Sequence, residues 1–309
     1  MGTNSTRLLV ADVDGADLAE VERLLRITRL GDRVDAAGRL SDAGMERVHT
    51  VLEDYAARAR ELGAERVLAT ATSAVRDADN GSEFLADVRQ QHGFETRLLS
   101  GREEAELTYR GVTSRLAAGP GTLVCDIGGG STELVLGGPA GVLDATSLDV
   151  GCVRMSERCL RSDPPTAAEL AELREAVAAL LPREITSRTS TLVGVAGTVT
   201  TLAALDLGLE QYDRDRVDGY LLTRRAAQSQ LHRLAALSLE ERRQVPALEP
   251  ERAPVIVAGA AILVATLAYF GLNTITASER DILDGIALAA AELPAPDEGA
   301  APPGAFTCC

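Results

Sequence analysis

Residues 124–133, with the sequence VCDIGGGSTE, give the strongest indication of how this chain folds. An apolar run leads into it and Leu134-Val135-Leu136 follows it, so two buried strands flank the three glycines. Glycines let a backbone turn its N–H groups toward an anion. The pattern therefore predicts the turn of a β-hairpin that cradles phosphate. A P-loop is excluded, because that motif needs a lysine and this chain contains none.

A similar loop opens the chain. Residues 2–10 align with residues 128–136, with Gly, Ser, Thr and Leu identical and two further positions aliphatic in both. Such self-similarity indicates two related halves, each with one phosphate-binding hairpin. Chance similarity between two Gly/Ser/Thr-rich stretches is the alternative. In this alignment the partner of Asp126 would precede Met1, so we expect the first strand of the first half to be missing.

Seven motifs, in this order, resemble the exopolyphosphatase and guanosine pentaphosphate phosphohydrolase (Ppx/GppA) family. They are residues 2–7, 71–78, 99–106, 126–134, 150–154, 194–202 and 278–285. The resemblance runs nearly end to end. It implies an α/β fold with two domains of the actin-like (ribonuclease H-like) superfamily, which includes sugar kinases and Hsp70 ATPases, and a cleft between them.

Hydrophobic periodicity and turn residues give the same α/β class. The Gly/Pro-rich residues 117–121 predict a domain boundary, with actin-like domains over 1–118 and 119–293 and a disordered Pro/Ala/Gly-rich tail over 294–309. Residues 17–27 fit a strand or a short helix. Other strands are expected near 66–71, 96–99, 122–126, 133–137, 142–149 and 192–196, and helices near 41–62, 82–92, 103–115, 167–181, 198–208, 223–236, 254–270 and 281–292.

Composition narrows the class of protein. The net charge is −15 and every basic residue is an arginine, so long-range repulsion argues against nucleic acid and anionic membranes as partners. Residues 253–278 carry no charge and are long enough to span a bilayer. They are rich in Ala and Gly and lack an aromatic belt, which favours a buried core helix instead.

The cysteines and histidines suggest no site of their own. Five cysteines without CxxC spacing indicate neither a zinc site nor a disulfide framework, and with no signal peptide a cytoplasmic location is expected. None of the three histidines adjoins a candidate motif. Acid–base chemistry therefore falls to carboxylates.

Glu103 and Glu104 begin an expected helix, where acidic residues are commonplace because the helix dipole favours them. The family resemblance gives Glu104 the role of catalytic base, since it occupies the second glutamate of the Gly-x-Glu-Glu-Ala motif. The resemblance also places Arg76 beside the substrate, and its planar guanidinium suits phosphate oxygens. Weaker candidates for binding phosphate oxygens are Arg7, Arg29, Arg33, Arg154 and Arg280.

Asp126 and Glu133 flank the glycine loop and are the metal candidates, for Mg²⁺ (or Mn²⁺). The alternatives are a plain turn-forming Asp and a solvated strand Glu. Gly197 and Thr198 follow a further expected strand and resemble the family's next phosphate loop, with a helix-capping turn as the alternative. The expected phosphate-binding residues are Thr3, Asn4, Ser5, Gly128, Gly129, Gly130, Ser131, Gly197 and Thr198.

The function that the resemblance implies is metal-dependent hydrolysis of the terminal phosphoanhydride of inorganic polyphosphate, with release of orthophosphate. Hydrolysis of pppGpp to ppGpp would use the same residues. A sugar-kinase-like phosphotransferase shares the fold, but its ATP loops and sugar site are not evident in the sequence. A catalytically silent sensor of polyphosphate or an alarmone is the alternative from another class. A homodimer is compatible with all of these.

Overall fold

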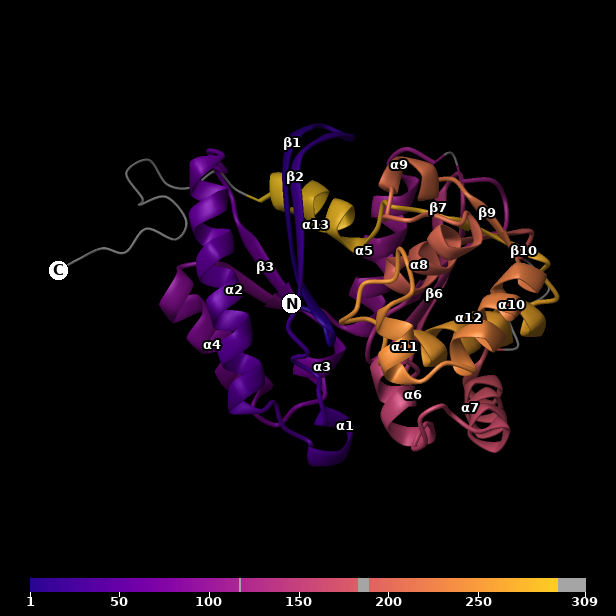
Figure 1. Ribbon diagram of the computed structural model, residues 1–309. Coiled ribbons are helices and arrows are strands. Elements are labelled where there is room, and N and C mark those ends of the chain that lie inside the picture. Colours follow the sequence, from indigo (N-terminus) through magenta and orange to yellow (C-terminus); the bar gives the residue numbers. More distant parts are fainter. Residues whose placement is uncertain (117, 183–188, 294–309) are drawn as a thin grey trace. The chain divides into compact units, whose positions relative to one another are not determined.

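The computed structural model describes residues 1–116, 118–182 and 189–293 (Figure 1). These residues form two compact units. Unit 1 combines Met1–Arg115 with the described residues from Ile282 onward, and unit 2 is Leu116–Asp281.

Unit 2 is built on a sheet in the strand order β7-β6-β5-β8-β10-β9. Its strands are β5 (Thr122–Ile127), β6 (Thr132–Gly138), β7 (Gly141–Leu148), β8 (Thr191–Val195), β9 (Leu221–Thr223) and β10 (Thr274–Ala277). β5, β8 and β10 run parallel. β6 pairs antiparallel with β5, β7 with β6, and β9 with β10. Parallel strands linked through helices confirm the α/β class.

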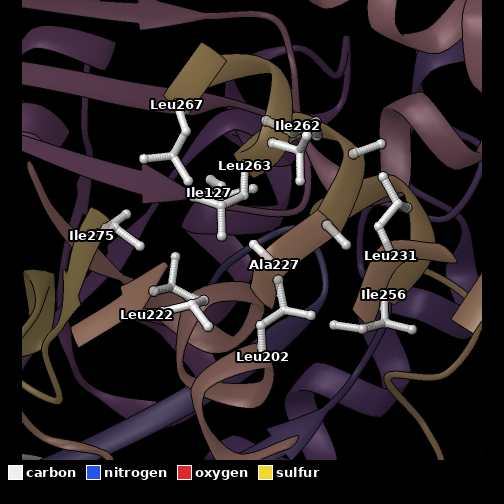
Figure 2. Close-up of a cluster of buried hydrophobic side chains, with 14 of the residues drawn as sticks. Ile127, Leu202, Leu222, Ala227, Leu231, Ile256, Ile262, Leu263, Leu267 and Ile275 are labelled. Carbon is white, nitrogen blue, oxygen red and sulfur yellow. The ribbon is translucent and has the colours of Figure 1, made fainter. Parts of the chain in front are cut away.

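The helices of unit 2 pack against this sheet and against one another. They are α6 (Cys152–Cys159), α7 (Ala167–Leu180), α8 (Ala196–Asp206), α9 (Arg214–Val217), α10 (Arg224–Ala235), α11 (Leu239–Arg243) and α12 (Ile256–Tyr269). Figure 2 shows Ile256, Ile262 and Leu263 of α12 among the buried side chains of the core. The apolar part of the uncharged segment is thus a buried core helix, as predicted, and the end of that segment forms β10. Among the helices described, none is long and apolar enough to cross a membrane.

Unit 1 contains two small sheets and its own helices. The antiparallel pair is β1 (Ser5–Asp14) with β2 (Asp17–Ile27), and the parallel pair is β3 (Leu68–Ala71) with β4 (Glu95–Leu98). The helices are α1 (Val34–Ala37), α2 (Asp42–Glu61), α3 (Ser73–Arg76), α4 (Gly81–His92), α5 (Gly101–Thr113) and α13 (Ile282–Ala291). Residues 17–27 are therefore a strand, the first of the two structures that their pattern allowed.

Local signals explain where the main helices of unit 1 begin. The Ser41 hydroxyl accepts a hydrogen bond from the Gly44 amide at 3.2 Å and so caps α2, as its position before the helix predicts.

Two of the three histidines contact each other between helices. His49 on α2 and His92 at the end of α4 form a hydrogen bond of 2.9 Å between their Nδ1 and Nε2 atoms. These two histidines therefore help to join helices in the core and lie away from the candidate motifs.

The two hairpins β1–β2 and β6–β7 share the same local hydrogen bonding and the same register shift at aligned positions. The Gly2 amide donates to the Ser5 carbonyl at 2.9 Å, and the aligned Gly128 amide donates to the Ser131 carbonyl at 3.0 Å. Both hairpins also shift register at aligned positions, after Val10 in β1 and after Leu136 in β6. An identical turn and an aligned bulge support duplication over chance similarity.

The helix α13 corrects the expected domain boundary. We expected it within the second domain, over 119–293, but it packs against α5 in unit 1. Gly285 permits this close approach, because a Cβ there would lie 1.9 Å from the Leu107 carbonyl oxygen. Asp284 adds an ion pair of 2.8 Å with Arg23. The predicted tail over 294–309 lies outside the described residues.

Candidate active site

The first turn of α5 gives its two glutamates different environments. Glu103 completes a capping box: its carboxylate accepts the Ser100 amide at 2.9 Å, while its own amide donates to the Ser100 hydroxyl at 3.2 Å. It also pairs with Arg97. These contacts lower the pKa of Glu103, chiefly through the Ser100 backbone. The purely structural reading of an acidic first turn therefore describes Glu103.

Glu104 is different, because its side chain is buried and only 8% of the residue is exposed. Its Oε2 atom lies 3.3 Å from Nη1 of Arg76, and it also hydrogen-bonds with the Thr72 side chain. Burial raises the pKa of Glu104, whereas the charge and hydrogen bond of Arg76 and the Thr72 bond lower it. A carboxylate with a raised pKa is suited to accept a proton from water.

The turn from β3 into α3 connects this carboxylate to the first hairpin. Arg76 ends α3 and donates to the Leu99 carbonyl at 2.8 Å as well as to Glu104. Ser73, at the start of α3, lies 2.9 Å from the Thr3 hydroxyl. Unit 1 thus brings the predicted residues Thr3, Arg76 and Glu104 into one connected cluster.

In unit 2 the two metal candidates face each other across the hairpin. Asp126 on β5 pairs in register with Glu133 on β6, so their side chains share one face of the sheet. Both are buried, with 7% and 1% exposed, and the Ser147 hydroxyl donates to Glu133 at 2.7 Å. These environments differ from that of a solvated strand residue.

The oxygen donors of this pair suit a hard divalent cation. No group of three or more His, Cys, Asp or Glu side chains is placed to hold a metal ion in the part of the chain described. Two carboxylates nevertheless fit Mg²⁺, which keeps several water ligands and is usually bound through one or two carboxylates together with substrate phosphates.

Gly197 and Thr198 lie beside the glycine loop. Asp126 on β5 is the register partner of Val195 on β8, after which α8 begins. The side chain of Thr198 hydrogen-bonds with Cys152, whose amide donates to the Gly128 carbonyl at 2.9 Å. The cap of α8 is Val195, which makes no side-chain capping bond, so Gly197 and Thr198 sit in the first turn of the helix. First-turn amides have no partner within their helix and commonly bind anions.

Sequence reasoning missed Arg252, which packs on Gly197. A Cβ at position 197 would lie 1.4 Å from Nη1 of Arg252. Glu249 holds the guanidinium through a 3.2 Å ion pair. No short-range signal could reveal this contact, because the arginine lies 55 positions after the glycine in the sequence. Among the weaker arginine candidates for phosphate binding, Arg154 contacts the glycine loop: its Nε atom donates a hydrogen bond to the Gly130 carbonyl at 2.7 Å.

Comparison with known proteins settles the family. The sequence pattern of the Ppx/GppA phosphatase family matches residues 9–292. The chain belongs to this family. It is 42% identical over 313 residues to Exopolyphosphatase 2 of Mycobacterium tuberculosis, covering 94% of this chain and 96% of that protein. It is also 30% identical to a bifunctional 3-dehydroquinate synthase/phosphatase of Fusobacterium nucleatum, covering 94% of this chain and 46% of that longer protein.

Solved structures confirm the fold expected for a Ppx/GppA protein. The crystal structure of an exopolyphosphatase-like protein matches with a TM-score of 0.88 at 35% identity, over 93% of this chain and 95% of that one. The Aquifex aeolicus member of the Ppx/GppA family matches with a TM-score of 0.78 at 33% identity, over 94% of each chain. The resemblance read from seven short motifs is therefore confirmed over almost the full length.

Proposed function

We propose that this protein is an exopolyphosphatase, which hydrolyses the terminal phosphoanhydride bond of inorganic polyphosphate and releases orthophosphate. The observation that carries the proposal is the buried Glu104 carboxylate held by Arg76, in a chain of the Ppx/GppA phosphatase family. Its similarity to a protein named Exopolyphosphatase 2 supports polyphosphate as the substrate.

In this proposal Glu104 accepts a proton from the attacking water as the oxygen bonds to phosphorus and the bridging P–O bond breaks. Its raised pKa makes it a stronger base than an exposed glutamate, and Arg76 keeps enough of it ionised to act. Arg76 also holds the carboxylate in place, since its guanidinium is anchored on the Leu99 carbonyl.

The phosphate ligands of the proposal come from backbone and side chains. The glycine-loop residues Gly129 and Gly130, with Thr198 in the first turn of α8, would bind phosphate oxygens, and Arg252 would add a positive charge next to Gly197. Such local groups can attract a polyanion although the whole chain carries a net charge of −15.

We assign the divalent cation, Mg²⁺ (or Mn²⁺), to Asp126 and Glu133, which would hold it directly or through water. A bound cation neutralises negative charge that develops on phosphoryl oxygens during transfer. Ser147 orients the Glu133 carboxylate for this purpose through its 2.7 Å hydrogen bond.

Replacing Glu104 tests the proposal, and Glu103 provides a matched control on the same helical turn. Glu104→Gln keeps the shape and removes the proton acceptor, so phosphate release from polyphosphate should fall by about 100-fold or more. Glu103→Gln keeps a side chain that can complete the capping box and loses only an exposed ion pair, so phosphate release and thermal stability should both stay close to wild type. Phosphate release and thermal unfolding are measured for both variants.

Equal phosphate release by the wild type and Glu104→Gln would refute the assignment of the base. Binding of polyphosphate without any release, by a wild-type protein that is folded and supplied with Mg²⁺, would favour the sensor function instead.

Hydrolysis of pppGpp is the second candidate, and Tyr212 is the observation that favours it. The residue is 42% exposed, and its hydroxyl hydrogen-bonds with Glu279 and with Thr200 of α8, three residues beyond Gly197. Desolvation of its hydroxyl group and the Glu279 contacts raise the pKa of Tyr212, so the hydroxyl stays neutral although the residue is partly exposed. A fixed, exposed ring suits stacking with a nucleobase. Rates of phosphate release from polyphosphate and pppGpp, compared side by side, decide between the two substrates.

A further inference from the structure

A loop precedes each of the hairpins β1–β2 and β6–β7, and the segment that follows the hairpin turns back and hydrogen-bonds to the carbonyl groups of that loop. In unit 2, residues 151–154 follow β7. The Cys152 amide donates to the Gly128 carbonyl at 2.9 Å, and the Val153 and Arg154 amides donate to the Gly129 carbonyl at 2.8 and 3.2 Å. The Arg154 side chain adds a bond to the Gly130 carbonyl at 2.7 Å. Three successive carbonyls of the loop are thus held by one segment.

Unit 1 repeats this arrangement with different side chains. Residues 28–31 follow β2, and the Thr28 and Arg29 amides donate to the Asn4 carbonyl at 3.1 and 2.9 Å. The Gly31 amide donates to the Thr3 carbonyl at 2.8 Å. Thr3 and Asn4 are the positions that align with Gly129 and Gly130. We call residues 28–31 and 151–154 the carbonyl-binding segments.

These bonds also determine where the loop amides point. In a trans peptide, the N–H of a residue is antiparallel to the carbonyl of the residue before it. Because the carbonyls of Gly128 and Gly129 face residues 151–154, the amides of Gly129 and Gly130 point away from that segment. The Asn4 amide likewise points away from residues 28–31. Successive amides oriented in this way form an anion-binding surface.

One glycine in each segment makes the close approach possible. A Cβ at position 151 would lie 2.2 Å from the Gly129 carbonyl oxygen, and a Cβ at position 31 would lie 2.3 Å from Cγ2 of Thr3. Neither glycine is in the left-handed region, so the requirement is space rather than an unusual backbone conformation. The obstacle at Gly31 is a side-chain methyl, whereas at Gly151 it is the backbone itself.

We propose that the two carbonyl-binding segments are positioning devices that orient the loop amides toward phosphate, with Gly31, Gly151 and Arg154 as positioning residues. The proposal rests on the proposed function, in which these loops bind phosphate. Arg154 then acts on the substrate through the Gly130 carbonyl, instead of being the direct phosphate ligand that its sequence position suggested.

The variant Gly31→Ala tests the proposal, and a second substitution, Thr3→Ser, tests whether the lost activity can be restored. The new methyl displaces Thr3 and the loop, so kcat/KM on polyphosphate should fall about 10- to 100-fold, the range expected for misplacing binding groups by up to about 1 Å. Thr3→Ser removes the colliding methyl but keeps the hydroxyl that contacts Ser73. The double variant Thr3→Ser/Gly31→Ala should therefore recover most of the loss, measured against Thr3→Ser alone.

The affinity for inorganic pyrophosphate, measured by calorimetry, gives a readout that does not need turnover. It should weaken in Gly31→Ala and recover in the double variant, while thermal unfolding shows that both remain folded. A folded Gly31→Ala with wild-type affinity and turnover, or a folded double variant without recovery, would overturn the proposal. A wild type that binds pyrophosphate but releases no phosphate would contradict the proposed function alone.

Arg154→Met provides the test if Gly31→Ala does not fold. This substitution keeps a long, unbranched side chain but removes the charge and the hydrogen bond to the Gly130 carbonyl. The control variant Arg158→Met removes one positive charge from an exposed position of α6. Pyrophosphate affinity should fall in Arg154→Met and stay close to wild type in Arg158→Met. Equal effects of the two changes would mean that charge alone matters, and the positioning role would be rejected.

Discussion

At the scale of single residues, the pair Arg76 and Glu104 controls the proposed chemistry through the pKa of one carboxyl group. Burial pushes that pKa upward, and Arg76, 3.3 Å away, opposes the shift. The base must be ionised to accept a proton, so the balance between these two effects sets the lower pH limit of activity.

Arg76→Ala should therefore move the acid limb of the kcat–pH profile to higher pH. Without the guanidinium, burial acts on Glu104 with less opposition and its pKa rises further. Arg97→Ala is the matched control, because Arg97 pairs with Glu103 rather than Glu104. The profile is measured by initial rates of phosphate release. An acid limb that stays in place, or that moves equally in both variants, contradicts this account.

At the scale of elements, Glu169 fixes the start of α7. Its carboxylate accepts the Thr166 amide at 2.7 Å and hydroxyl at 2.9 Å, and also the amides of Arg161 and Ser162 at 2.8 and 2.9 Å. These bonds, first of all that from the Thr166 backbone, lower the pKa of Glu169 from 4.5 to about 2. One side chain thus satisfies the helix start and the loop that precedes it.

Glu169→Gln should lower the melting temperature at neutral pH, because a neutral amide accepts these hydrogen bonds less strongly. A folded-state pKa below the unfolded value gives stability that is complete above pH 4.5 and is lost as pH falls through about 2. The difference in melting temperature between variant and wild type should shrink over this window. Glu172→Gln, which removes an exposed ion pair on the same helix, should show little effect at any pH. A pH-independent difference for Glu169→Gln would argue against an ionic cap.

At the scale of the whole molecule, the chain leaves unit 1 after α5, builds unit 2, and returns with α13. Asp284 of α13 is fully buried and pairs with Arg23 of β2 at 2.8 Å. The return of the chain therefore depends on a charge pair between residues that are far apart in the sequence.

Asp284→Asn should destabilise the protein by about 3 kcal/mol, since it breaks an ion pair whose carboxylate is fully buried, although Arg23 keeps its second charged partner, Glu20. Urea denaturation followed by circular dichroism measures the loss. Glu292→Gln is the control: it breaks an exposed pair with Arg110 that links the end of α13 to α5 instead of to β2, and should cost much less. Similar losses for both variants would show that burial of the pair is unimportant.

Much of the fold could be predicted because its signals are local. Ser41 before an amphipathic run marks the start of α2, and three glycines between apolar strands mark the β5–β6 hairpin. The strands β9 and β10 were missed, since Leu221–Thr223 and Thr274–Ala277 are too short for a periodic pattern. Their pairing with each other joins residues about fifty positions apart, which no local pattern encodes.

The residues of the candidate site fall into two groups: those that are neighbours in the sequence and those that packing brings together. Asp126, Glu133 and the glycine loop are adjacent in sequence, so their proximity follows from a single hairpin turn. Arg252 against Gly197 and Arg76 against Glu104 depend on packing between elements, and only the second pair could be anticipated, through family motifs.

The amino-acid sequence alone is enough to predict the α/β class, the family, the duplicated hairpins and most candidate residues, because hydrophobic periodicity, glycine-rich turns and motifs depend on residues close together in the chain. The folded structure was needed to show which glutamate of the α5 turn is buried, which unit contains α13, and which segments bind the loop carbonyls. These outcomes depend on burial and hydrogen bonding between residues distant in the chain, and such contacts exist only once the core has formed.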